Sequence, residues 1–217
     1  KAHTGAIGGD SQLGLITIST DEGVDGHAFL GSSGRSAEFD AGSLIQYLKP
    51  IVMGQNPLNR ERLFEVMIRI ERNTTIRAVG AVDIALWDIS GQVAGQPIYN
   101  LLGGACRDRV RTYNTTGQYG ANRDMEMAVL DAGTLAKSLL DEGITAMKWA
   151  FTDQFADINR GTHISSEDLK LLIKPVEDIR AAVGDRIEVA NDGHGRWNLN
   201  SAIKIGKAMD HLDMMWQ

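Results

Sequence analysis

The sequence contains a single cysteine, Cys106, and this scarcity excludes two classes of protein. One thiol cannot form a disulfide within the chain, and it cannot supply a metal site built from several cysteines. Basic residues are fewer than acidic ones: the sequence has 22 Lys and Arg residues and 28 Asp and Glu residues, which gives a net charge of -6. Nucleic-acid binding needs a basic face for the phosphates, so this balance argues against a nucleic-acid partner.

Long apolar runs are absent as well, and none approaches the length of a membrane span. The first residue is Lys1 rather than Met, and no charged leader with an apolar core follows it, which leaves open a processed leader upstream. At 217 residues, 43% hydrophobic and 23% charged, the chain is large enough for one large or two small domains. We expect a cytoplasmic homo-oligomer with no membrane contact.

Two patterns divide the N-terminal half. Residues 11–31 alternate between apolar and polar positions around an Asp-Glu-Gly break, which predicts an antiparallel hairpin. Because a two-stranded hairpin is marginal by itself, we expect a further strand upstream of Lys1. Residues 36–94 have helical spacing, and the longest apolar stripe there is closed by Gly95 and consists of Ile76, Val79, Val82, Leu86, Ile89 and Val93.

From about Val110 the pattern alternates between strand and helix. This alternation indicates parallel strands joined by crossover helices. An eight-unit barrel takes roughly 250 residues, so the stretch is either a small open sheet or the first part of a longer barrel. Pro175 is expected to begin a new turn or kink its helix. Strands are expected at residues 110–116, 144–151, 187–192 and 212–216, and helices at residues 128–139, 165–184 and 199–209.

The segment EVANDGHGRWN, residues 188–198, places an acid and a histidine at the carboxyl end of the third of these strands. Side chains alternate across a strand, so Ala190, Asp192 and His194 share one side if the extended conformation continues, and Ile187 and Val189 take the other. In parallel barrels, ligand chemistry gathers at the carboxyl ends of the strands. The spacing therefore makes Asp192 and His194 candidate site residues.

The preceding strand, in ITAMKWAF, has the same parity. It directs Ala146, Lys148 and Ala150 inward, with Met147 and Trp149 outward. Lys148 thus faces the side on which the next strand carries its aspartate, where it could serve as a base or as an electrostatic stabiliser. The residues alone also allow a simpler interpretation, in which the Asp-x-His pair is a solvated turn and the lysine only extends to solvent.

A resemblance supports the site interpretation. The run RAVGAVDIALWDISGQVAGQPIYNLLGG, residues 77–104, followed by RDRVRTYNTTG, resembles the enolase superfamily in its mandelate racemase and muconate lactonizing branch. The resemblance implies an α+β capping domain over residues 1–109, with its N-terminal strand missing. It also implies that residues 110–217 form the first half of an α/β (modified TIM) barrel, truncated before its remaining units.

The same resemblance assigns roles to particular residues. Asp192 matches the first of three carboxylate ligands for Mg²⁺, and the other two ligands and the base are expected after Gln217. Lys148 matches the first lysine of a Lys-x-Lys motif, whose second position holds Ala150 here, and this departure argues against a lysine base. His194, in Asp-x-His-Gly-Arg, resembles the general acid of the acid-sugar (galactonate-type) dehydratases. Arg196 is a candidate substrate-binding residue.

The implied activity is that of a hydro-lyase. Dehydration of a sugar acid of the aldonate or uronate class would proceed by α-proton abstraction through an enediolate and give a 2-keto-3-deoxy acid. Mg²⁺ suits such chemistry because a divalent ion neutralises the charge that develops. Two alternatives stay open: a racemase, epimerase or cycloisomerase of the same superfamily, and a non-catalytic relative that binds acid sugars.

Overall fold

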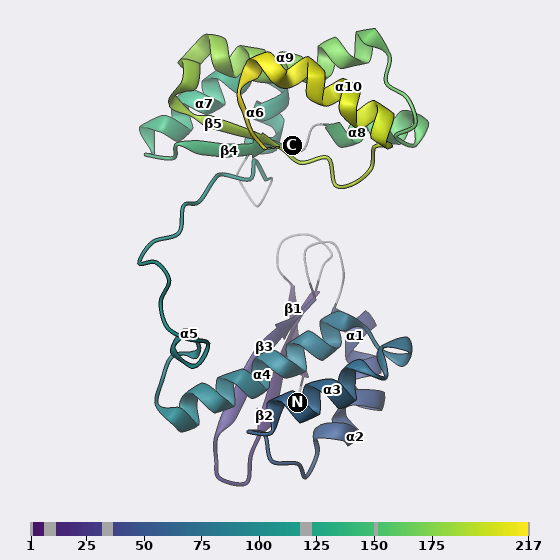
Figure 1. The fold of residues 1–217 in the computed structure, drawn as a ribbon, viewed down its shortest axis with the longest axis vertical. Coiled ribbons are helices and arrows are strands. Elements are labelled where there is room, and N and C mark those ends of the chain that lie inside the picture. The colour runs from purple at the N-terminus through teal and green to yellow at the C-terminus, as the bar shows by residue number, and fades with distance from the viewer. Residues whose placement is uncertain (1, 7–11, 32–36, 118–122, 150–151, 217) are drawn as a thin grey trace. The chain divides into compact units, whose positions relative to one another are not determined.

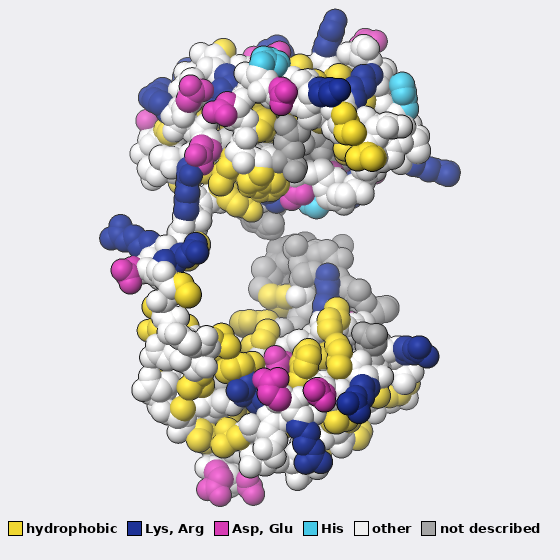
Figure 2. Space-filling view, in the orientation of Figure 1, with side chains coloured by type: hydrophobic (Ala, Val, Ile, Leu, Met, Phe, Trp, Pro, Cys, Tyr) yellow, Lys and Arg dark blue, Asp and Glu magenta, His cyan; other side chains and the backbone are white. Residues whose placement is uncertain are grey.

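The computed structural model describes residues 2–6, 12–31, 37–117, 123–149 and 152–216. The chain divides into two compact units, Lys1–Asp108 and Arg109–Gln217 (Figure 1). Acidic and basic side chains are interspersed on the visible face of each unit (Figure 2), in keeping with the small net charge. None of the described helices is both long enough and apolar enough to cross a membrane.

The sheet of the first unit is antiparallel. Strands β1 (Ala2–Ala6), β2 (Gln12–Ser19) and β3 (Asp25–Leu30) pair in the order β1-β2-β3. The predicted hairpin is confirmed by the pairing of β2 with β3. The third strand that the hairpin needs is β1, which occupies the free edge of β2; the strand expected upstream of Lys1 stays a prediction. The β1 sequence, Ala-His-Thr-Gly-Ala, has no apolar alternation, so periodicity could not reveal β1.

Helices cover this sheet, and the longest of them, α4 (Ile76–Ala94), lies along it (Figure 1). The other helical elements of the unit are α1 (Ala37–Ser43), a π-helical turn (Leu44–Leu48), α2 (Lys49–Val52), α3 (Arg60–Ile68), a 3₁₀ turn (Glu71–Asn73) and α5 (Ile98–Leu101). The core of the unit forms between α4, the sheet and the neighbouring helices.

Helix α4 has well-defined ends. The Thr75 hydroxyl accepts a hydrogen bond from the Ala78 amide at the start, and Gly95 ends the helix with φ 60°. The predicted apolar stripe is buried at its four central positions, whereas Ile76 and Val93, in the first and last turns, are exposed. The stripe was therefore predicted correctly for the helix interior and too long at both ends.

Strand β3 approaches α4 unusually closely at Gly26. A Cβ atom built on Gly26 would lie 2.1 Å from the Ala85 carbonyl oxygen. On either side of this contact, Asp88 Oδ2 accepts a 2.8 Å hydrogen bond from the His27 amide, and Gln92 Nε2 donates a 2.7 Å bond to the Asp25 carbonyl. The helix can sit this deep on the sheet because position 26 has no side chain.

The second unit alternates strands and helices, and its sheet is parallel, as predicted. Strands β4 (Ala146–Trp149), β5 (Glu188–Asn191) and β6 (Met214–Trp216) pair in the order β4-β5-β6. The helices are α6 (Asp124–Leu130), α7 (Ala132–Asp141), α8 (Thr152–Asn159), α9 (Ser166–Val183) and α10 (Leu199–Met209) (Figure 1).

Three details of this unit differ from the sequence prediction. The expected strand at residues 110–116 is reduced to one parallel bridge, between Asn114 and Met147. The single helix predicted over residues 128–139 is two helices, because Asp131 leaves the helical conformation and its carboxylate caps α7 by accepting from the Thr134 amide. The new turn that was one of two expectations at Pro175 is not there, because Pro175 lies inside α9 (Ser166–Val183); the alternative, a kink, stays a prediction.

A single arginine ties α9 to the sheet at the amino-terminal ends of β5 and β6. The Arg180 guanidinium donates to four backbone carbonyls, those of Gly184, Ile187, Leu212 and Asp213, at 2.8 to 3.2 Å. The fixed fork of five guanidinium N–H groups can satisfy several acceptors at once. Arg180 thus fixes the backbone segments that precede β5 and β6 relative to each other.

The glycine contact in the first unit yields a stability prediction. Gly26→Ala should destabilise the chain by roughly 1–3 kcal/mol, because its methyl group overlaps the Ala85 carbonyl. Gly80→Ala is the matched control, since position 80 lies within α4 with nothing within 4 Å of the new methyl group. It should stabilise the chain by roughly 0.5–1 kcal/mol. Urea denaturation, with hydrogen exchange of the α4 amides, measures both, and equal effects would contradict the close approach.

Candidate active site

Lys148 and Asp192 meet at the carboxyl ends of β4 and β5. The parallel register pairs Lys148 with Ala190, and the Asp192 amide donates a 2.8 Å hydrogen bond to the Trp149 carbonyl. Lys148 Nζ lies 3.0 Å from Asp192 Oδ2, and the two side chains are 17% and 26% exposed. The structure therefore brings together the lysine and the aspartate that strand parity placed on one side.

His194 reaches Asp192 by a different route from the one predicted. The chain does not stay extended: Arg196 N donates to Gly193 O at 3.0 Å, and His194 and Gly195 both have positive φ, 47° and 66°. The condition that the extended conformation continues to His194 is not met, because a tight turn with left-handed central residues follows the strand. Within this turn the His194 amide donates to Asp192 Oδ1 at 3.1 Å, and ring Nε2 lies 3.5 Å from Asp192 Oδ2.

Helix α8 adds two acids to the cluster that the sequence analysis missed. Asp153 Oδ2 lies 2.7 Å from His194 Nδ1 and 3.5 Å from Arg196 Nε, and Asp157 Oδ1 accepts a 2.6 Å bond from Arg196 Nη1. The available signal was the four-residue spacing of the two acids, which places them on one face of a helix. Ala150, which stands at the second lysine position of the Lys-x-Lys motif, lies outside the described residues.

The turn that carries His194 rests against the end of α8 at Gly161. A Cβ atom on Gly161 would lie 1.8 Å from the Arg196 carbonyl oxygen, and Gly161 itself has φ 67°. Asn198 N donates to the Gly161 carbonyl at 2.9 Å, and Asn198 Nδ2 donates to the Thr162 carbonyl at 3.0 Å. This contact fixes where residues 193–198 run and so where the imidazole is presented.

The pKa of Asp192 lies below the usual value for an aspartate. Burial acts to raise it, but the hydrogen bonds from Lys148 and from the His194 amide, together with the nearby positive charge, lower it by more. Asp192 is thereby held as a carboxylate, the oxygen-donor form that divalent cations such as Mg²⁺ bind.

Asp192 has the properties of a magnesium ligand, but it could supply only one of the several oxygen ligands that Mg²⁺ needs. It is ionised, partly exposed and at the carboxyl end of a parallel strand. Within the described residues, no three His, Cys, Asp or Glu side chains lie together as a metal-binding group. A complete Mg²⁺ site needs further oxygen ligands.

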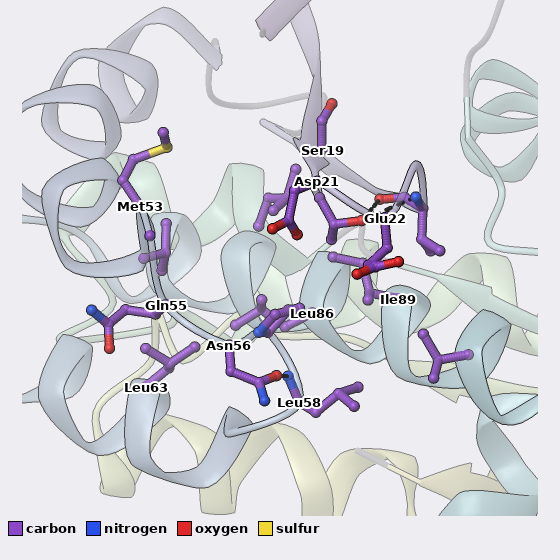
Figure 3. A pocket seen from close by; sticks show the side chains of 17 residues that line it. Ser19, Asp21, Glu22, Met53, Gln55, Asn56, Leu58, Leu63, Leu86 and Ile89 are labelled. Atoms are coloured by element: carbon purple, nitrogen blue, oxygen red, sulfur yellow. Dashed lines mark hydrogen bonds between the residues drawn. The ribbon is translucent and has the colours of Figure 1, made fainter.

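A separate pocket of about 670 Å³ lies in the first unit (Figure 3). Its floor is apolar, formed in part by Leu63, Leu86 and Ile89, and Asp21 and Glu22 line it from the β2–β3 turn. None of the residues at the ends of β4 and β5 contributes to it. The candidate active site is the cluster around Asp192, because an ammonium, carboxylates and an imidazole lie within hydrogen-bond or ion-pair distance there.

Each of the two units matches the model of a known domain family. Residues 5–103 match the N-terminal domain of the mandelate racemase / muconate lactonizing enzyme family, and residues 131–217 match the enolase C-terminal domain-like family. Among solved structures, an enolase of the mandelate racemase subgroup from Agrobacterium tumefaciens superposes with a TM-score of 0.80 at 34% identity. The match covers 99% of this chain and 55% of that one.

Two curated relatives carry dehydratase names. The chain is 33% identical over 202 residues to a D-galactonate dehydratase of Verminephrobacter eiseniae, a match that covers 91% of this chain and 49% of the relative. It is 37% identical over 133 residues to a D-gluconate dehydratase of Thermoproteus tenax, covering 61% of this chain and 25% of the relative. The chain thus spans about half the length of the first relative.

The lowered pKa of Asp192 gives a pH prediction. Because the folded value lies below the unfolded one, the Lys148–Asp192 pair stabilises the fold above the usual aspartate pKa, and this contribution is lost as the pH falls through the lowered value. Lys148→Met should raise the pKa of Asp192, as burial then meets less opposition. A ¹³C NMR titration of the Asp192 carboxyl measures this. The control is Lys174→Met, which removes a lysine that pairs with Asp178 and should leave the Asp192 midpoint unchanged. Equal Asp192 midpoints in the parent and both variants would contradict the pairing of Lys148 with Asp192.

Proposed function

Because the chain belongs to the mandelate racemase / muconate lactonizing enzyme branch of the enolase superfamily, we propose that the protein dehydrates a sugar acid. The resemblance carried by residues 77–104 is confirmed, and the chain has the family's fold, with an N-terminal capping domain and part of a C-terminal barrel domain. The dehydratase names of the galactonate and gluconate relatives support the reaction class.

The convergence of Lys148, Asp192 and His194 is the observation that carries this proposal. An ammonium, a carboxylate and an imidazole lie within hydrogen-bond or ion-pair distance at the carboxyl ends of two neighbouring parallel strands. That edge is where barrel enzymes perform their chemistry. The three groups differ in charge and proton content, so each can take a separate part in one reaction.

Removal of the α-proton leaves negative charge on the substrate carboxylate, and this charge must be stabilised. Lys148 is suited to that task as a fixed ammonium only partly exposed to solvent. Asp192 would supply one carboxylate ligand to Mg²⁺, which when bound would add Lewis-acid stabilisation of the same charge. Arg196, at the edge of the cluster, would bind a substrate oxygen. We assign none of the described residues as the base that removes the α-proton.

His194 is proposed as the general acid. Hydroxide is a poor leaving group, so the Cβ–O bond breaks more easily when a proton reaches the departing oxygen. The α-proton goes to a base, the proton on His194 leaves with the hydroxyl as water, and the enol that results tautomerises to the 2-keto-3-deoxy acid. Nε2 of His194 faces Asp192, which places the donated proton beside the group that would hold the metal.

The assignment of His194 predicts a separation of two steps. In the complete protein, His194→Asn should abolish dehydration while leaving exchange of the α-proton with solvent deuterium, provided that proton removal is reversible. NMR of the variant with a panel of aldonates and uronates in D₂O measures keto-acid formation and α-deuteration together. Undiminished dehydration would remove His194 from the mechanism. Deuteration without dehydration in the parent protein would instead favour an epimerase or racemase.

The assignment of Asp192 predicts a loss of metal affinity. Asp192→Asn removes a charged oxygen ligand and should weaken Mg²⁺ binding to the complete protein, as measured by isothermal titration calorimetry, with activity falling in limiting Mg²⁺. Asp185→Asn is the control, because Asp185 is an exposed carboxylate in the turn before β5, at the other end of the strand. Equal affinities for both variants and the parent would show that Asp192 is not a ligand.

A further inference from the structure

The His194 ring is fixed although its side chain is 48% exposed. An imidazole on a surface turn can rotate about two side-chain torsions, and each rotation changes which nitrogen faces the substrate side. Here both ring nitrogens face carboxylates: Nδ1 lies 2.7 Å from Asp153 Oδ2, and Nε2 lies 3.5 Å from Asp192 Oδ2. The shorter contact, to Asp153, is the one that can set the ring orientation.

Asp153 is itself held in place. It lies in the first turn of α8, where the preceding Thr152 is fully buried and its hydroxyl donates to the Asp192 carbonyl at 3.4 Å. The Asp153 side chain is 21% exposed, and its Oδ1 is enclosed with no hydrogen-bond partner among the described atoms. Oδ2, the other oxygen, faces both His194 and Arg196. The carboxylate therefore presents one oxygen to the imidazole from the first turn of α8.

We propose that Asp153 is a positioning residue that holds the proton on Nδ1 of His194 and directs Nε2 toward Asp192. An ionised carboxylate has no proton to donate, so a 2.7 Å contact with it places the shared hydrogen on the ring nitrogen. The proton that the ring exchanges with a substrate is then the one on Nε2. The catalytic consequence of this arrangement rests on the proposed dehydratase function, but the arrangement itself does not.

The tautomer of His194 tests the inference without any measurement of activity. In ¹⁵N NMR spectra at about pH 8.5, where an ordinary imidazole is neutral, Nδ1 of His194 in the parent should show the shift of a protonated nitrogen. In Asp153→Ala that signal should move toward the shift of an unprotonated nitrogen. Asp153→Leu, which keeps the number and branching of the side-chain heavy atoms but has no acceptor, should give the same change and covers the case in which the alanine variant folds poorly.

Asp157 provides a matched control. It lies one helical turn further along α8 and contacts Arg196 rather than His194. Asp157→Ala should therefore leave the Nδ1 shift as it is in the parent. If Nδ1 keeps its proton to the same degree in Asp153→Ala and Asp153→Leu, or if Asp157→Ala changes it equally, the positioning role is overturned.

A second measurement shows whether Asp153 acts through His194. In the complete protein, Asp153→Ala should lower kcat by roughly 10- to 100-fold, the usual effect of removing a carboxylate that orients a histidine, with little change in KM. The double variant Asp153→Ala/His194→Asn should exchange the α-proton with solvent deuterium as fast as His194→Asn alone, because Asp153 acts only through the imidazole. A further loss of exchange in the double variant would overturn the assignment. Absence of dehydratase activity in the parent would contradict the proposed function, whereas the tautomer measurement would still decide the role of Asp153.

Discussion

The parallel register between β4 and β5 is the constraint on which the candidate site depends. Side chains alternate across a strand, so a slip of one residue in either strand would turn its inward side chains to the opposite face. In the observed register Lys148 lies level with Ala190, and the hydrogen bond from the Asp192 amide to the Trp149 carbonyl extends the pairing one step beyond β5. The ion pair between Lys148 and Asp192 is possible only in this alignment.

The register is secured from the side opposite the site and from the other end of the sheet. Met147 and Val189 are fully buried in the core that the sheet shares with α7 and α9. At the amino-terminal ends of β5 and β6, Arg180 bonds four carbonyls. Apolar burial fixes which face turns inward, and Arg180 fixes where the strands start. The pairing of the strands therefore does not depend on burial of the polar groups at their carboxyl ends, which are partly exposed.

The sequence was informative where structure follows local periodicity. Alternation alone placed Lys148 and Asp192 on one side of neighbouring strands, and the structure brings them together. The sequence left open whether the Asp-x-His pair lies on a strand or in a turn, and the structure has a turn, with left-handed backbone at His194 and Gly195. Asp153 was missed, since the role of an acid on a short polar helix depends on the imidazole beside it. The break at Asp131 required recognition of a capping side chain inside an apolar stripe.

The contact at Gly161 also constrains how this site could change by mutation. The Arg196 carbonyl occupies the space that any side chain at position 161 would need, so the two segments cannot vary independently. A relative with a larger residue at the equivalent of Gly161 must route its Asp-x-His loop along another path, and its histidine would then meet the strand ends at a different angle. One small residue at the end of a helix could therefore serve as a sequence marker that sorts relatives by loop geometry. In a redesign of specificity, position 161 would have to be varied together with residues 193–198.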